Sequence, residues 1–411
     1  MKKNNTILVL PFSHTLSHLS RPLVVSKHLK ENGHKIIYGA GSPKTGFIED
    51  EGFEVLPSFE PDPDLLFSNI RSNKIRFVSD ETIEKMIASD IALIEQTQPD
   101  LILSDGRFSV PVSAQVCGIK HAGIVNASST DFRAIPYLPV EKIPFYASLD
   151  KKGGQKAIHW ALLKFEMAVF DNVMNVFKRL SRKYGLGKTV TATNCLEGVD
   201  LTLLADVPEY FPTKNLPGNY HYIGPLTWKP SGSVLPEWWP PEKKGGKLIY
   251  ISMGTTGLGD FFSMVFDLFK DLDYKIVMTT GAQSDKVKSI PGRLYVEPFI
   301  DGDKVMEVAD LVVCHGGNGT IYQALSHGRP VVGIPTLPDQ AYNMRMVERL
   351  GLGTLITWQA FFDNPGILLE KVKQTLDCRD IVKRTRAFSS ILQGYGRQRR
   401  SLDLIEDLLK S

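Results

Sequence analysis

One stretch in the second half of the chain combines a histidine, glycines and polar residues in an order that suits anion binding. An apolar run, Asp310 to Cys314, enters the loop His315-Gly316-Gly317-Asn318-Gly319-Thr320, and a helix-like run, Ile321 to His327, follows it. Glycines let a backbone pass close to a ligand, and the N–H groups of a first helical turn favour negative charge. His315, at the mouth, can donate to a phosphate oxygen. For so short a motif the alternative is a tight strand-to-helix turn without a ligand.

A second pair of polar residues follows the next expected strand. Gly328 ends the helix, Pro330 to Ile334 forms the strand, and Asp339 and Gln340 stand just beyond it. Ligands of parallel sheets bind at the carboxyl ends of the strands. We therefore expect Asp339 and Gln340 to face the same site as His315.

As a whole, this stretch resembles the donor-binding signature of the glycosyltransferase family that contains plant secondary-product, animal UDP-glucuronosyl and bacterial macrolide glycosyltransferases. The matching residues are His315, Gly317, Gly319, Thr320, Gln323, Ala324, Gly328, Pro330, Asp339 and Gln340. The resemblance implies the α/β fold called GT-B, in which two Rossmann-like domains face each other across a cleft. It further implies that the diphosphate of a nucleotide sugar lies at the loop and that Asp339 and Gln340 hold sugar hydroxyls.

Two further segments match weaker parts of the family pattern. Ser252-Met253-Gly254-Thr255-Thr256-Gly257 resembles a loop whose N–H and hydroxyl groups reach the diphosphate, and an ordinary turn is the alternative. Phe299, beside Ile300, falls where many members carry a tryptophan that stacks on uracil. The Pro-Gln that usually follows is replaced by Asp301-Gly302, which leaves the choice of base open.

A base for the reaction is expected in the first half of the chain. His14 and His18 lie between the first expected strand and a helix expected to begin at Arg21. Glycosyl transfer needs a base for the acceptor hydroxyl, and a histidine is mostly neutral at pH 7. The resemblance places the family's catalytic histidine at His18, although Ser17 replaces the usual preceding glycine. The alternatives are a structural role for His18 and an exposed loop position for His14.

Asp105 is the candidate partner of that base. It follows the expected strand Leu101 to Ser104, where a carboxylate can fix the imidazole tautomer and stabilise its cation. Many family members have an aspartate there. The alternative is a helix N-cap.

Strand and helix signals alternate through both halves of the chain, as a parallel sheet requires. Four segments are expected: an N-terminal Rossmann-like acceptor domain at 1–206, a proline-rich linker at 207–246, a nucleotide-sugar domain at 247–395, and a C-terminal helix at 396–411 that packs back on the first domain. The other expected strands are Thr6 to Leu10, Lys35 to Ala40, Phe53 to Leu56, Ala122 to Asn126, Lys247 to Ser252, Lys275 to Thr280 and Arg293 to Val296.

One long amphipathic helix is expected from Gln155 to Lys183. The first interpretation is that it packs on the core, and the second is that it forms a wall of an acceptor pocket. A membrane-surface helix is the third, because the acidic residues Glu166 and Asp171 interrupt its apolar pattern. Aromatic residues around it suggest a flat or apolar acceptor such as a polyketide, terpenoid or phenol. The acceptor contacts we expect are Phe67, Phe132, Tyr137 and Phe145.

Composition excludes several classes of function. The 411 residues carry a net charge of only +3, which does not argue for nucleic acid, and four scattered cysteines suggest neither zinc nor disulfides. No run is long enough to span a membrane. The strings Asp62-Pro63-Asp64 and Asp301-Gly302-Asp303 match metal-binding DxD motifs weakly, and both are interpreted as metal-free.

These observations predict an inverting, metal-independent glycosyltransferase that needs no cofactor beyond its nucleotide sugar, UDP- or TDP-linked. His18 would deprotonate the hydroxyl of a small acceptor, with Asp105 as its partner. The alternative is a catalytically silent GT-B protein that activates a partner transferase. A cytoplasmic location is expected, and weak membrane association and a monomeric or homodimeric state stay open.

Overall fold

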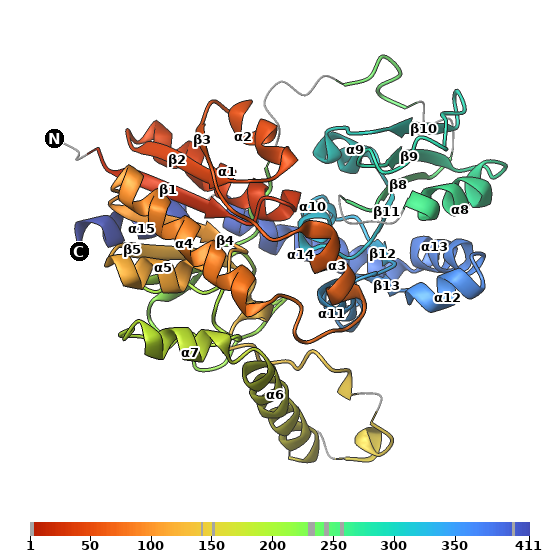
Figure 1. Cartoon of the computed structure of the whole chain (residues 1–411). Coiled ribbons are helices and arrows are strands. Elements are labelled where there is room, and N and C mark those ends of the chain that lie inside the picture. The colour runs from red at the N-terminus through yellow and green to blue at the C-terminus, as the bar shows by residue number, and fades with distance from the viewer. Residues whose placement is uncertain are drawn as a thin grey trace. The chain divides into compact units, whose positions relative to one another are not determined.

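The computed structural model describes residues 4–140, 143–149, 153–228, 235–241, 246–254, 259–396 and 399–411. The chain forms two compact units, Met1–Leu226 with Arg399–Ser411, and Thr227–Gln398 (Figure 1). The segment from 207 to 226, expected in the linker, therefore belongs to the first unit. Each unit is an α/β unit built on one parallel sheet.

The first unit contains a seven-stranded sheet in the order β3-β2-β1-β4-β5-β6-β7. Its strands are β1 Thr6–Pro11, β2 Lys35–Ala40, β3 Glu54–Pro57, β4 Leu101–Asp105, β5 Lys120–Val125, β6 Leu201–Leu204 and β7 Tyr220–Tyr222. Its helices are α1 Leu16–Glu31, α2 Gly46–Glu49, α3 Pro63–Arg71, α4 Asp80–Thr97, α5 Val110–Cys117, α6 Gly154–Val173, α7 Val176–Lys183 and α15 Arg400–Lys410. Five of these strands were expected, whereas β6 and β7 are too short to give a clear pattern.

The second unit contains a six-stranded sheet in the order β10-β9-β8-β11-β12-β13. Its strands are β8 Leu248–Ser252, β9 Lys275–Thr279, β10 Leu294–Glu297, β11 Leu311–Cys314, β12 Val331–Gly333 and β13 Gly353–Leu355. Its helices are α8 Gly259–Phe269, α9 Gly302–Val308, α10 Asn318–Ser326, α11 Pro338–Arg349, α12 Trp358–Asp363, α13 Ile367–Asp377 and α14 Arg379–Gly396. The inner strands are buried on both faces, as continuous apolar runs such as Leu248 to Ile251 indicate.

The first helix begins earlier than its sequence suggests. Proline favours a first helical turn, so the sequence suggests a start near Pro22, but α1 begins at Leu16 and takes Pro22 into its interior. His18 therefore lies in a helix and not in the expected loop. His18 and Arg21, three residues apart, occupy one helix face, and both contact Asp105, which favours a helix over a loop.

The long helix expected from Gln155 to Lys183 is two helices. It breaks after Val173, and α7 restarts at Val176 in a different direction (Figure 1). The break lets Val176, Phe177 and Leu180 join a buried apolar cluster with Phe12 and Phe108, whereas Leu163 is the buried residue of α6. Burial of the α7 face thus outweighs continuation of the helix.

The C-terminal helix α15 packs within the first unit, against α1 and β6. His34 Nε2 lies 2.9 Å from Glu406 Oε1, and Lys120 Nζ donates to the Leu408 carbonyl at 2.9 Å. These contacts attach the end of the chain to the sheet that its beginning forms.

Both sheets have a point where the strand order reverses direction, and ligands of open α/β sheets bind there. In the first unit this point lies between β1 and β4, where Pro11 pairs with Asp105. In the second it lies between β8 and β11, where Ser252 pairs with Cys314. Each unit therefore brings its candidate residues to the carboxyl ends of two adjacent strands. None of the helices in the described part of the chain has the length and apolar character to cross a membrane.

Candidate active site

His18 and Asp105 meet at the switch point of the first unit. His18 Nδ1 lies 2.6 Å from Asp105 Oδ1, and the carboxylate is fully buried whereas the imidazole is 30% exposed. A carboxylate accepts the proton of Nδ1, so this contact favours the tautomer with a free lone pair on Nε2. The arrangement can take a proton from an incoming hydroxyl.

Arg21 holds the aspartate in place. Its Nε donates to Asp105 Oδ2 at 2.7 Å and its Nη2 donates to Oδ1, so the carboxylate is bound at both oxygens. Its Nη1 donates to Asn126 Oδ1 at 2.7 Å, and the Asn126 amide in turn lies 3.3 Å from both Asp206 oxygens. Sequence reasoning missed Arg21, because a helix expected to begin at that residue hides its three-residue spacing from His18.

Gly106 leaves the space that the His18 ring occupies. Its φ is +70°, and a Cβ there would lie 2.7 Å from the imidazole Cγ and Nδ1. A side chain at this position would therefore displace His18 and would strain the backbone.

His14 is not the exposed loop residue that was expected. Its Nε2 lies 3.8 Å from Glu60, whose carboxylate also accepts the Ser13 and Gly41 N–H groups at 2.9 and 3.1 Å. Burial lowers the pKa of His14, although Glu60 opposes this effect. His14 is thus a partly buried neighbour of the His18 site, linked to it through Phe12, which contacts both rings.

His315 lies at the switch point of the second unit, between two glycines. A Cβ on Gly254 would lie 2.6 Å from the ring Cε1, and one on Gly317 would lie 2.5 Å from Nε2. Burial lowers the pKa of His315 to about 4, and the Ser252 backbone opposes this shift. The imidazole is therefore neutral at pH 7, and its buried Nδ1 has no hydrogen-bond partner among the described residues.

The first turn of α10 adds unsatisfied polar groups beside His315. Gly317 is the N-cap residue, no side chain caps the helix, and the first backbone bond back to this turn is from Ile321 N to Gly317 O. Asn318 Oδ1 is also buried without a partner in the described chain. Free N–H groups, the helix dipole and a neutral imidazole donor together can bind a diphosphate.

Three other expected donor residues, Ser252, Phe299 and Ile300, lie at or beyond the carboxyl ends of β8 and β10. Ser252 ends β8, and its Oγ accepts the Gly254 N–H at 3.4 Å. Phe299, exposed, and Ile300, partly exposed, follow β10. Thr255 lies outside the described residues.

Asp339 and Gln340 occupy the first turn of α11 but differ in exposure. Asp339 is exposed. Gln340 is buried, and its Oε1 accepts the N–H groups of Thr336 and Leu337 at 3.0 and 3.1 Å. This glutamine oxygen caps the helix, so of the two side chains Asp339 is the better placed to meet a sugar.

The expected acceptor residues are spread over the first unit. Phe67 packs on Phe12, which contacts His18. Phe132 stacks edge-on against Tyr220, Tyr137 lies under the Arg133 guanidinium, and Phe145 is exposed. The structure thus brings one of the four, Phe67, near the candidate base.

Carboxylates of both DxD strings have structural partners. Asp62 and Asp301 cap α3 and α9, and Asp303 accepts from Gln323 Nε2 at 3.0 Å and lies 3.2 Å from His327 Nε2.

Cys314 is buried, and burial raises the pKa of its thiol to about 12. Its side chain therefore belongs to the core.

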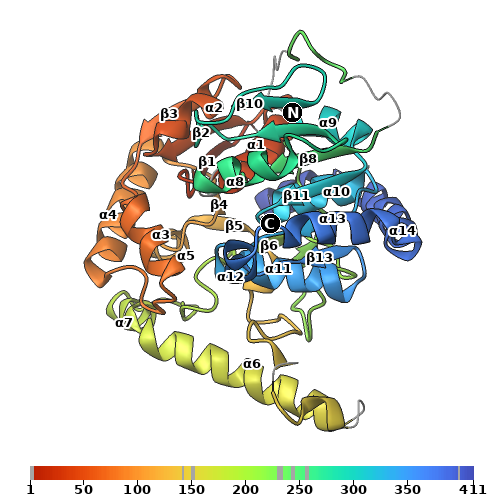
Figure 2. The same cartoon turned by 90° about the vertical axis from the view of Figure 1, so that its right-hand side faces the viewer.

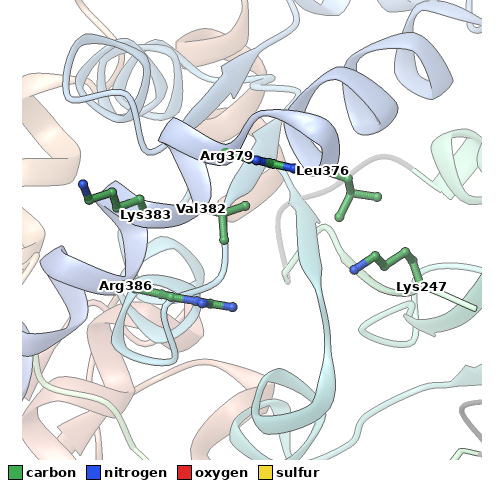
Figure 3. Close-up of a pocket in the computed structure, with 6 residues that line it drawn as sticks. All are labelled: Lys247, Leu376, Arg379, Val382, Lys383 and Arg386. Carbon is green, nitrogen blue, oxygen red and sulfur yellow. The ribbon is translucent and has the colours of Figure 1, made fainter.

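A basic groove of about 400 Å³ lies elsewhere in the second unit. Lys247 and Arg386 point toward one another from opposite sides of it (Figure 3). The residues that line it are Lys247, Leu376, Arg379, Val382, Lys383 and Arg386. Lys247 precedes β8, so the groove lies at the amino ends of the strands, away from His315.

Comparisons with known proteins agree with this geometry. Residues 248–387 match the model of the glycosyltransferase family 28 C-terminal domain. A Mycobacterium tuberculosis protein named PGL/p-HBAD biosynthesis glycosyltransferase is 27% identical over 375 residues, which are 91% of this chain and 85% of that protein.

Solved glycosyltransferases share the fold over nearly the whole chain. The glycotransferase of kitacinnamycin superposes with a TM-score of 0.71 at 21% identity, covering 98% of this chain and 99% of that one. The Streptomyces glycosyltransferase SsfS6, complexed with thymidine diphosphate, gives 0.67 at 17% identity, covering 95% and 96%. The chain therefore has the GT-B fold of the glycosyltransferases that its motifs resemble, and its second unit carries the glycosyltransferase family 28 C-terminal domain.

Proposed function

We propose that the chain is an inverting, metal-independent glycosyltransferase that moves a sugar from a nucleotide diphosphate to a hydroxyl of an apolar or aromatic acceptor. The observation that carries this proposal is the His18–Asp105 pair at the switch point of the first unit, held by Arg21. The fold and the family 28 domain give the reaction class its context.

His18 acts as the general base. Asp105 accepts the Nδ1 proton, so Nε2 takes the proton of the acceptor hydroxyl as that oxygen attacks the anomeric carbon. The bond from the anomeric carbon to the leaving diphosphate breaks in the same step, which inverts the configuration. Asp105 then stabilises the imidazolium, and Arg21 keeps the carboxylate oriented.

His315 and the first turn of α10 receive the diphosphate. Charge develops on the leaving oxygen, and prepositioned N–H donors lower the transition-state energy more than they stabilise the bound substrate. The neutral His315 ring donates one hydrogen bond and adds no positive charge, because its pKa lies near 4. The solved neighbour with thymidine diphosphate supports a nucleotide diphosphate as the donor's leaving group.

The acceptor is proposed to be apolar and to carry a hydroxyl. Phe12 lies beside His18 and is buried, and the partly buried Phe67 packs on Phe12, so apolar surface lies close to the candidate base. The mycobacterial relative is named for PGL/p-HBAD biosynthesis, and the kitacinnamycin enzyme for a natural product.

Donor binding tests the nucleotide half of the proposal. UDP and TDP sugars are titrated calorimetrically with and without Mg²⁺, against the parent chain and His315→Ala. One donor is expected to bind without Mg²⁺, raise the apparent stability, and bind at least tenfold more weakly to the variant. Failure of every nucleotide sugar to bind would refute the proposal.

Transfer is then measured with that donor across phenolic, polyketide and terpenoid alcohols, with the anomeric configuration of the product read by NMR. An inverted product is expected. A silent partner-activator would bind the donor and give no product with any acceptor until a second protein is added. The intact His18–Asp105–Arg21 geometry favours the enzyme over that alternative.

A further inference from the structure

Helix α6 presents large apolar side chains to solvent. Trp160 and Phe165 are each 61% exposed, and the helix extends away from the sheet of its own unit (Figures 1 and 2). Ala157, Ala161 and Ala168 are exposed on the same side of the helix, each three or four residues from Trp160 or Phe165. Trp160, Phe165, these three alanines and Lys164 form the outer face of α6.

The two acidic residues of α6 do not reach this outer face. Glu166 is 10% exposed, contacts Arg133 at 3.3 Å, and accepts the N–H groups of Tyr137 and Leu138 at 3.0 and 2.6 Å. Asp171 is 16% exposed, pairs with Lys178 at 3.3 Å and accepts the Thr193 N–H at 3.0 Å. The sequence-based objection to a membrane-surface helix rested on these two carboxylates, and their inward contacts remove it.

The charge that remains exposed on α6 is positive. Lys156 and Lys164 are both exposed, and Lys164 lies between Trp160 and Phe165 on the outer face. A lysine can extend its ammonium group past an apolar surface, and a tryptophan has an apolar body with one N–H donor. Both side chains are typical of the boundary between lipid headgroups and acyl chains.

The outer face therefore combines exposed apolar side chains with positive charge, because Lys164 lies within it and Lys156 lies beside it. A large exposed apolar area marks an interaction site, and the charge of these lysines is complementary to an anionic partner. Phe145 and Leu138 are also exposed, but their segments attach to α6 through His159 and Glu166, on the side away from the outer face.

We propose that the outer face of α6 docks on a lipid surface that carries anionic headgroups, with the helix lying in the interface. Trp160 and Phe165 enter the boundary of the acyl chains, and Lys156 and Lys164 meet the lipid phosphates. Docking requires no glycosyl transfer, so it is measured without donor or acceptor. It would bring the first unit to acceptors dissolved in a membrane.

The test is cosedimentation of the full chain with phosphatidylcholine vesicles, with and without phosphatidylglycerol. The parent is expected to bind the anionic vesicles at least tenfold more tightly than the neutral ones. Trp160→Ser with Phe165→Ser should weaken binding at least tenfold. The matched control is Phe362→Ser, which removes a 63% exposed aromatic of the second unit and should leave binding unchanged.

A charge series separates the helix from the net charge of the chain. Lys156→Glu with Lys164→Glu should weaken binding at least about 25-fold, from about fivefold for each lysine removed. Arg379→Glu with Lys383→Glu, in the basic groove, changes the net charge equally and should have less than a threefold effect. All four side chains are exposed, so the melting temperatures should agree with the parent and exclude unfolding.

Three results would overturn the proposal. The first is that the parent does not bind anionic vesicles, and the second is that binding survives the α6 substitutions. The third is that the substitutions in the basic groove abolish binding as fully as the α6 substitutions do. A parent dimer that dissociates on Trp160→Ser with Phe165→Ser, without vesicle binding, would assign the face to a second copy of the chain instead.

Discussion

Asp105→Asn tests the base assembly through a change of one atom. The buried carboxylate accepts from Arg21 at both oxygens and from His18 at Oδ1. An amide has one acceptor and one donor end. Whichever way it turns, one of its N–H groups opposes an N–H of Arg21. The Arg21 guanidinium, itself largely buried, then loses its carboxylate partner among the described residues.

The expected cost follows from that loss. Removing one partner of a buried ion pair typically destabilises a protein by about 3–5 kcal/mol, and we expect the variant to lie in this range. The imidazolium that forms during transfer also loses its stabilising charge. A reduction of kcat by up to about 10⁴-fold is expected by analogy with other carboxylate–histidine pairs.

Urea unfolding and steady-state transfer measure the two effects, and Asp90→Asn is the matched control. Asp90 is equally buried in the same unit and pairs with Arg107 at 2.7 Å. It should lower stability similarly while kcat per folded molecule stays within threefold of the parent. If Asp105→Asn retains the parental kcat, or if Asp90→Asn lowers kcat as much, the role assigned to Asp105 is refuted.

Three further predictions concern the second unit and the thiols. Gly317→Ala should weaken donor binding in calorimetry at least tenfold and should lower stability, because the added Cβ would lie 2.5 Å from the His315 ring. Gly319→Ala is the control, because the added Cβ meets open space and should not lower stability. Equal losses of stability in the two variants would contradict the close approach of Gly317 to His315. Burial lowers the pKa of His315 to about 4, against about 6.5 in the unfolded chain. The contribution of the neutral His315 ring to the free energy of unfolding is therefore complete above pH 6.5 and falls by about 3 kcal/mol towards pH 4. Urea titrations of His315→Gln should show a flatter pH dependence over that window, and an unchanged slope would refute the shift. The buried thiols of Cys195 and Cys314 should react with a thiol reagent only after unfolding, so rapid native labelling of either would be contrary to their burial.

The position of the candidate site residues could be predicted from the sequence, because ligands of parallel sheets bind at the carboxyl ends of the strands. His18, Asp105 and His315 follow apolar runs that are strands, so their shared edges could be inferred from the sequence. Features that depend on tertiary contacts could not be predicted from the sequence. Arg21 reaches Asp105 from the same helix face as His18 only because α1 begins before it, and Gln340 is buried because its oxygen caps α11.

Helix α6 shows the same limit in another form. The apolar period continues from α6 into α7, so periodicity alone predicts one helix and cannot locate the break after Val173. Nor does it reveal that Glu166 and Asp171 turn inward, since their partners Arg133 and Thr193 are distant in sequence. The outer face of α6 can therefore be identified only from these tertiary contacts.

The most direct test of the central claim is one comparison of parent and His18→Ala, with donor affinity and transfer rate measured on the same preparations. His18 belongs to the first unit and the His315 site to the second, so donor affinity is expected to stay within threefold of the parent while transfer falls by about 10²–10⁴-fold. Transfer by His18→Ala at the parental rate would refute the assignment of His18 as the base.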